Sequence, residues 1–179
     1  MRDEARRRRA TRYALTTQWL LASPIETVWD ALAVPQGWPQ WWPYLDAVVP
    51  LVHGDADSIG AVWRYTWSSR LPYRLTFDMT TTASRYPELI EGVASGELRG
   101  RGCWRLARDG SNTRVRYAWT VTTGKRWMSV LAPLLGRVFE WNHDQVMHAG
   151  GCGLARHLGV RLLAYHRLKN DEDGTCITC

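Results

Sequence analysis

The sequence predicts an α+β fold in which a curved antiparallel sheet wraps around one long C-terminal helix, with two short helices after the first strand. Three observations lead to this prediction. Apolar and polar residues alternate along several segments of residues 46–123, which is the period of a strand that buries one face. Apolar residues recur every three or four positions over residues 128–168, which is the period of a helix. A helix start and a proline-rich segment separate the first strand from the others, over residues 23–45.

The first strand and the first helix have well-marked boundaries. The segment RYALTTQWLLA, residues 12–22, contains tyrosine, leucine and tryptophan at positions that favour a strand. In SPIETVWDALA, which follows, Ser23 can cap a helix, Pro24 suits the first helical position, and Glu26 completes a Ser-x-x-Glu capping box. We therefore expect a capped helix that begins after Ser23 and ends at Pro35.

The segment GWPQWWPYL, residues 37–45, combines three tryptophans with two prolines. Because proline restricts the residue before it and lacks a backbone N–H, we expect only a short helix or turn here. Trp38, Trp41 and Trp42 are large amphipathic rings that either fill the core or line an apolar space. The sequence leaves both interpretations open.

The next segments read as strands with one aromatic face. AVVPLVH is the first of them, and Pro50 favours an edge position. AVWRYTWS places Trp63, Tyr65 and Trp67 on one face and Arg64 on the other. YRLTFDMTTT repeats the pattern with four apolar residues, namely Tyr73, Leu75, Phe77 and Met79. We expect these aromatic faces to point toward the C-terminal helix.

The later strands form a hairpin. GCWRLARDGSNTRVRYAWTVTT turns at Asp109-Gly110, and its second arm places Tyr117 and Trp119 on the inner face. The preceding ELIEGVASGELRG is a weaker strand, whose glycines indicate bulges or bends. Glu91 in this strand either turns inward or stays solvated at the sheet surface.

The final segment predicts one long helix from about residue 128 to residue 168. Gly150, Gly151 and Gly153 interrupt its apolar pattern, although glycine destabilises a helix interior by about 1 kcal/mol each. Such glycines are tolerated where the helix approaches another backbone closely, or where it bends.

Charge and composition exclude several classes of protein. Of the net charge of +6, residues 1–12 carry +4, which leaves +2 for the rest of the chain. We expect residues 1–10 to be a disordered basic tail and residues 169–179 to be a flexible C-terminal tail. Nothing in the body of the chain indicates nucleic-acid binding. No apolar run suits a transmembrane helix or a signal peptide, so we expect a cytoplasmic protein. We also expect a monomer or a weak homodimer.

Several of these motifs, in this order, resemble the START/Bet v 1-like helix-grip superfamily (SRPBCC), and within it the polyketide cyclase/dehydrase and lipid-transport branch. They are SPIETVWDAL, WPQWWPYL, GCWRL with NTRVRYAWTV, and FEWNHDQVMHAGGCGLARHL, and the resemblance covers residues 11–168. It implies one helix-grip domain with an elongated apolar cavity between the sheet and the long helix. Members of this group bind lipids, sterols or polyketides, and only some are enzymes, so no fixed reaction is implied.

His143 is the candidate catalytic residue. Helical spacing from Leu154 places it on the face that points toward the sheet, beside Asn142. Histidine suits the proton transfers of a cyclisation or dehydration. The alternative is a structural histidine that bonds to a nearby carbonyl, to Asp78 or to Glu91.

The other candidate residues would bind a ligand in the cavity. They are Trp38, Trp41, Trp42, Trp63, Tyr65, Trp67, Tyr73, Phe77, Glu91, Trp104, Tyr117, Trp119, Phe139, Asn142 and Met147. No histidine, cysteine or acidic residue has the spacing of a metal site, and no phosphate loop or nucleophile motif is present, so we expect neither a metal nor a cofactor.

Two functions remain open from the sequence. The first is a non-catalytic carrier or sensor that binds a hydrophobic small molecule, such as a lipid or polyketide, in the internal cavity. The second is a polyketide aromatase/cyclase or dehydratase that uses His143 as acid and base.

Overall fold

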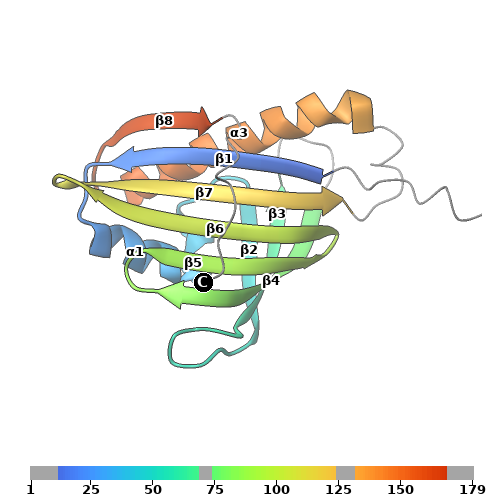
Figure 1. Cartoon of the computed structure of the whole chain (residues 1–179), viewed down its shortest axis with the longest axis horizontal. Coiled ribbons are helices and arrows are strands. Elements are labelled where there is room, and N and C mark those ends of the chain that lie inside the picture. The colour runs from blue at the N-terminus through green and yellow to red at the C-terminus, as the bar shows by residue number, and fades with distance from the viewer. Residues whose placement is uncertain (1–11, 69–73, 124–131, 169–179) are drawn as a thin grey trace, which may run out of the picture.

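A computed structural model describes residues 12–68, 74–123 and 132–168 of the chain. Figure 1 shows a strongly curved sheet, with β1, β7, β6 and β5 toward the viewer and β2 and β3 behind them. The elements run along the chain as β1 (Arg12–Leu21), α1 (Ile25–Ala33), the 3-10 helix η1 (Pro35–Gln40), β2 (Leu45–Val52), β3 (Val62–Ser68), β4 (Arg74–Arg85), β5 (Leu89–Gly96), β6 (Leu98–Asp109), β7 (Asn112–Thr123), α3 (Ala132–His157) and β8 (Leu162–Leu168).

The sheet is antiparallel and has the strand order β2-β3-β4-β5-β6-β7-β1-β8. It does not close into a barrel, because β2 and β8 are edges without a common partner. Strands β2 to β6 each pair with the next strand along the chain, whereas β1 lies between β7 and β8 and pairs with both. The predicted α+β helix-grip architecture is therefore confirmed. Among the described helices, none is both long and apolar enough to cross a membrane.

The last element differs from the prediction of one helix to residue 168. The helix α3 ends at His157, and residues 162–168 form β8, which is antiparallel to β1. A Schellman motif ends the helix: the Gly159 N–H donates to the Arg156 carbonyl and the Val160 N–H donates to the Ala155 carbonyl, at 3.1 and 2.9 Å. Gly159 has φ +67°, a conformation that glycine adopts without strain. This glycine stops the helix, and the chain after it covers the free edge of β1.

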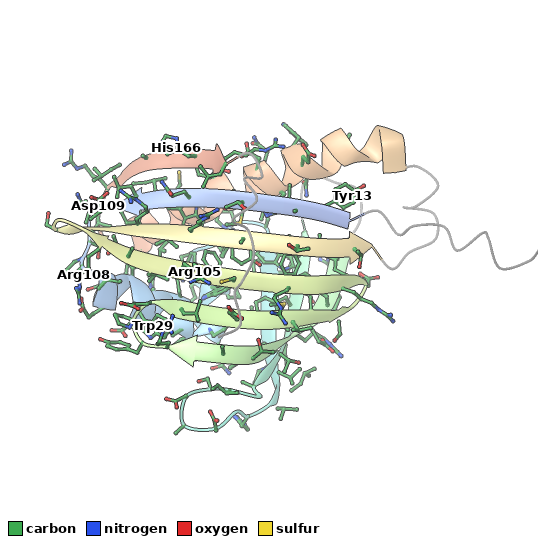
Figure 2. The ribbon with its side chains drawn as sticks, viewed as in Figure 1. Tyr13, Trp29, Arg105, Arg108, Asp109 and His166 are labelled. Carbon is green, nitrogen blue, oxygen red and sulfur yellow. The ribbon has the colours of Figure 1, made fainter. Side chains whose placement is uncertain are left out.

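The predicted capping box at the first helix is wrong, although the helix itself is confirmed. Pro24 occupies the N-cap position, and no side chain caps the helix. Ser23 is buried, and its carbonyl accepts a hydrogen bond of 2.7 Å from the Thr113 hydroxyl on β7. Glu26 forms an ion pair of 2.5 Å with Arg108 on β6, so it ties the helix to the sheet. Figure 2 shows Arg108 and the neighbouring Asp109 at this end of the sheet, beside α1.

Glycine also divides the weak strand that the sequence predicts around residues 88–100. Gly96 has φ +102° and is the last residue of β5, and β6 begins two residues later at Leu98. The two strands then pair with each other from Leu89 opposite Arg105 to Ala94 opposite Gly100. The glycine pattern thus marks a change of strand rather than a bend within one strand.

Candidate functional site

A cavity of about 200 Å³ lies between the inner face of the sheet, the α1–η1 region and α3. A single enclosed water needs about 10–15 Å³ by a comparable measure, so the cavity has room for a small organic molecule. Its wall is mainly aromatic and aliphatic. The predicted site residues that line it are Trp38, Trp42, Trp63, Tyr65, Trp67, Phe77, Glu91, Trp104, Tyr117, Trp119, Asn142, His143 and Met147.

The strands place an aromatic wall on the inner face of the sheet. Trp63, Tyr65 and Trp67 of β3 all line the cavity, which confirms the predicted alternation. Arg64 lies on the outer face, where its guanidinium pairs with Asp78 at 2.7 Å. This ion pair holds the pKa of the Asp78 carboxyl below its ordinary value, because the charged form accepts hydrogen bonds from Arg64. Asp78 is therefore no partner for a histidine inside the cavity.

Rings from neighbouring strands contact one another across this wall. The Trp104 and Tyr117 rings stack with their centroids 4.1 Å apart, and the Tyr65 and Phe77 rings stack at 5.8 Å. Gly102 makes room for them, since a Cβ at this position would lie 2.8 Å from the Tyr117 hydroxyl. Burial raises the pKa of both tyrosine hydroxyls well above the ordinary value. Both hydroxyls therefore stay neutral near pH 7.

The tryptophan-rich segment serves both of the roles that the sequence left open. Trp38 and Trp42 line the cavity, whereas Trp41 does not. All three side chains are buried, and the Trp41 ring stacks on the Trp42 ring with centroids 5.3 Å apart. The Trp42 indole N–H donates a hydrogen bond of 2.9 Å to the Val146 carbonyl of α3. Trp41 is thus a packing residue, and the expectation that it lines the cavity is wrong.

The glycine cluster of α3 lies directly on tryptophans. A Cβ at Gly150 would lie 2.3 Å from the Trp42 ring, and one at Gly151 would lie 3.0 Å from the Trp19 ring. A Cβ at Gly153 would lie only 1.8 Å from the backbone carbonyl oxygen of Trp41. Real Cβ atoms do not approach that closely, so the glycines permit the contact between the helix and the segment that precedes β2. The predicted close approach is confirmed.

Of the described side chains in the preceding part of α3, four face the cavity. They are Asn142, His143, Val146 and Met147. Burial lowers the pKa of His143 from 6.5 to about 4, because the charged imidazolium loses its solvation, and nearby Asp144 opposes this only in part. The imidazole is therefore neutral at pH 7. Its Nε2 is buried without a hydrogen-bond partner, so the expected bond from this nitrogen to a carbonyl or to Glu91 is not formed.

Among the described residues, two further polar atoms of the cavity wall also lack a hydrogen-bond partner. They are the indole Nε1 of Trp67 and the amide Oδ1 of Asn142, both fully buried. Buried polar atoms are nearly always hydrogen-bonded in native proteins. An unpaired atom destabilises the protein by about 1–3 kcal/mol. Three such atoms in one wall indicate a place where a polar group can bind.

Glu91 borders the cavity, but its carboxylate belongs to the outer face of the sheet. Its neighbours Ile90 and Gly92 line the cavity together with their cross-strand partners. Since successive side chains alternate, Glu91 and its partner Cys103 lie on the opposite face. The Glu91 Oε1 is 3.8 Å from the Cys103 Sγ. The Glu91 carboxylate is therefore not one of the polar groups that a ligand in the cavity would meet.

Two predicted ligand-binding residues cannot be placed in the cavity wall, and the wall contains residues that the sequence did not predict. Tyr73 and the side chain of Phe139 lie outside the described residues, whereas His166, expected on the helix, lies on β8 (Figure 2). Ser84 and Ile90 line the cavity but were not predicted. A bulge between Thr81 and Ala83 shifts the alternation of β4, which is why period-two spacing did not indicate Ser84.

No group of three or more metal-binding side chains lies close together in the part of the chain that the structure describes. The described residues that line the cavity also include no lysine or arginine. The arrangement can therefore enclose an apolar molecule and offer it a few neutral hydrogen-bonding groups.

Comparison with known proteins agrees with this geometry. A family model described as polyketide cyclase/dehydrase and lipid transport matches residues 14–150. The Zhui aromatase/cyclase from Streptomyces sp. R1128 superposes with a TM-score of 0.67 at 13% identity, over 83% of this chain and 94% of that one. A START superfamily protein from Mycobacterium smegmatis gives 0.68 at 11% identity, over 82% and 97%. The major latex-like protein 151 from Panax ginseng gives 0.62 at 11% identity, over 82% and 97%. No curated protein sequence matches the chain significantly.

Proposed function

The chain belongs to the polyketide cyclase/dehydrase and lipid transport family, and on that premise we propose that it binds a hydrophobic small molecule in its internal cavity, as a carrier or sensor. The observation that carries this proposal is the aromatic wall. Among the described residues, six tryptophans line a cavity of about 200 Å³, namely Trp38, Trp42, Trp63, Trp67, Trp104 and Trp119. Tryptophan and tyrosine rings contribute large apolar contact areas and prefer stacked or edge-on contacts with other rings. Such a wall suits a ligand that is flat and apolar over most of its surface.

An enzymatic role is the second candidate, and the unpaired Nε2 of His143 in the cavity wall is the observation in its favour. In this role His143 would remove or return a proton during a cyclisation or dehydration. A pKa of about 4 makes the imidazole a weak base, and at pH 7 almost none of it is protonated to act as an acid. The carrier or sensor role therefore has the better support.

Ligand binding is tested by filling the cavity. Thr81 lines the cavity, whereas the preceding Thr80 points to the outer face of β4. Thr81→Phe should weaken binding of naphthalene, anthracene and decanol by about tenfold or more, because the ring occupies the space they need. The matched control Thr80→Phe should bind as the unaltered protein does. Titrations would follow the quenching of tryptophan fluorescence, supported by isothermal calorimetry. Failure of all three probes to bind, or equal binding by Thr81→Phe, would contradict the proposal.

The His143→Phe variant separates the two candidate functions. A phenyl ring keeps most of the volume, so a carrier should retain its affinity for naphthalene within a few-fold. A cyclase should lose turnover of a poly-β-keto thioester by about 10²–10⁴-fold, the usual contribution of a general acid or base. If the unaltered protein converts this substrate and the His143→Phe variant does not, the enzymatic role is the correct one.

A further inference from the structure

Three unpaired polar atoms belong to residues of the cavity wall on β3 and α3, and both of these elements contact Trp42. The Trp67 ring meets the Trp42 ring edge-on, with centroids 5.3 Å apart. The Trp42 indole in turn is bonded to the Val146 carbonyl of α3. Asn142 lies one helical turn before Val146 and therefore on the same face of α3, and His143 is its neighbour. The Trp67 Nε1, Asn142 Oδ1 and His143 Nε2 thus belong to cavity-lining residues of β3 and α3, the two elements that Trp42 connects.

The three atoms differ in what they can bond. An indole N–H is only a donor, and an amide oxygen is only an acceptor. The neutral imidazole nitrogen of His143 is a donor or an acceptor, depending on its tautomer. A single group that both accepts and donates hydrogen bonds can satisfy the indole and the amide together. A hydroxyl does this, whereas a ketone satisfies only donors.

The charge of the cavity wall further limits the kinds of ligand that can bind. Among the described residues of the wall there is no lysine or arginine to pair with an anion. A carboxylate would also meet the Asn142 oxygen, which repels it, and would lose its hydration without compensation. A cation would meet the positive end of the Trp67 N–H, which repels it. The Glu91 carboxylate, which could pair with a cation, lies on the other face of the sheet. The wall therefore disfavours both kinds of ion.

We propose that the cavity selects uncharged molecules that carry a hydroxyl group on an apolar body, and that Trp67, Asn142 and His143 hold the hydroxyl. This inference rests on the proposed binding function and specifies its ligand class. The hydroxyl accepts a hydrogen bond from the Trp67 indole and donates one to Asn142 or His143. The remainder of the ligand lies against the aromatic wall.

Three probes with one ring system test the inference: naphthalene, 2-naphthol and 1-naphthoate, titrated at pH 7 by calorimetry. Because a hydroxyl favours water, burial alone would make naphthalene the tighter ligand of the first two. We expect 2-naphthol to bind about tenfold or more tighter than naphthalene, and 1-naphthoate to bind weakest. Trp67→Phe and Asn142→Leu should each remove most of this preference, measured as the ratio of the 2-naphthol and naphthalene affinities of the same variant. Trp63→Phe is the matched control, because Trp63 lines the cavity but its N–H is not among the buried unpaired atoms.

The outcomes distinguish this inference from the binding function on which it rests. Absence of binding by all three probes would contradict the binding function itself. Equal affinities for naphthalene and 2-naphthol would leave that function standing and overturn the hydroxyl site, as expected if a retained water satisfies the three atoms. Tightest binding by 1-naphthoate would show that the cavity selects anions, and would also overturn it. A preference for 2-naphthol that survives in both variants would place the hydroxyl elsewhere.

Discussion

From Gly150 onward, α3 lies directly against tryptophan, whereas between Asn142 and Met147 the same helix borders a cavity whose wall is also rich in tryptophan. We call these the packed part and the open part of α3. In the packed part, glycines let the helix approach until no space is left. In the open part, larger side chains line the cavity, and three polar atoms of its wall have no hydrogen-bond partner.

This difference shows that tryptophan content alone does not distinguish a core from a binding site. Trp42 belongs to both parts: its ring contacts Gly150 and also lines the cavity. Whether a tryptophan packs or borders a cavity is decided by the residue of α3 that faces its ring. The packed part should therefore respond to substitution with a loss of stability, and the open part with a change in binding.

The largest expected effect comes from adding a methyl group in the packed part. In Gly153→Ala the new Cβ would lie 1.8 Å from the Trp41 carbonyl oxygen, and a backbone atom cannot turn aside as a side chain can. We expect the free energy of unfolding to fall by at least about 3 kcal/mol, measured by urea denaturation. The control Gly37→Ala adds a methyl group with no atom within 4 Å, and should change stability by less than about 0.5 kcal/mol. Similar losses in the two variants would contradict the close-packing explanation.

The next effect concerns the pH dependence of stability in the open part. The pKa of His143 is about 4 in the folded protein against 6.5 ordinarily, so the unfolded chain binds more protons between these values. The unfolding free energy should therefore fall as the pH drops from 6.5 toward 4, by up to about 3 kcal/mol from this group, and the group should contribute no pH dependence above about pH 7.

The His143→Phe variant removes this titration. Its unfolding free energy should decline less than that of the unaltered protein over pH 6.5 to 4, when both are followed by chemical denaturation at each pH. Parallel curves for the two proteins would mean that His143 is not buried in its neutral form.

A pair of tryptophan substitutions compares the two parts directly. Trp42→Phe removes an N–H that donates to the Val146 carbonyl, together with ring contacts in the packed part. It should lower the unfolding free energy by about 2 kcal/mol. Trp67→Phe removes an N–H that has no partner, so its effect should stay below about 1 kcal/mol. Thermal and urea denaturation would test this order. A larger loss of unfolding free energy in Trp67→Phe than in Trp42→Phe would contradict the conclusion that the Trp42 N–H is bonded and the Trp67 N–H is not.

The smallest expected effect has the opposite sign. Asn142→Leu replaces a buried amide oxygen that has no partner with an apolar group of similar size. We expect it to raise the unfolding free energy by about 1 kcal/mol, because the unpaired atom is gone. Gln145→Leu, on the same helix but outside the cavity wall, is the control and should change stability less. A loss of stability in Asn142→Leu alone would show that the amide oxygen has a partner in solution.

Much of this architecture follows from local sequence pattern. The alternation in AVWRYTWS assigned Trp63, Tyr65 and Trp67 to the inner face and Arg64 to the outer face, because every second side chain of a strand shares a face. The helical spacing of α3 likewise brought Asn142 and His143 to the cavity. Local rules succeed here because each element has only one apolar face to bury.

The predictions failed where long-range partners decide the structure. Residues 162–168 have apolar residues at both strand and helix spacing, and only pairing with β1 makes them a strand. Gly159 was the available signal, as a glycine that ends a helix. Ser23 resembles a helix cap, but its contact with Thr113 on β7 holds it elsewhere. Trp41 packs while Trp42 lines the cavity, and both lie against glycines of α3, Gly153 and Gly150, that are more than one hundred residues away.

The strand order also has a consequence for the time at which the protein becomes complete during synthesis. Of the strands of this sheet, β1 is synthesised first, yet its partners are β7 and β8. Arg12, for example, cannot pair until Thr122 has been synthesised. Strands β2 to β7 can pair in succession as they appear, whereas closing so long a loop makes the docking of β1 slow. The packed part of α3 needs Trp19 from β1 as well as Trp41 and Trp42, and so it assembles after nearly the whole domain has been made. Until then these rings are exposed on a growing chain, and we expect that interval to be when the protein aggregates most readily.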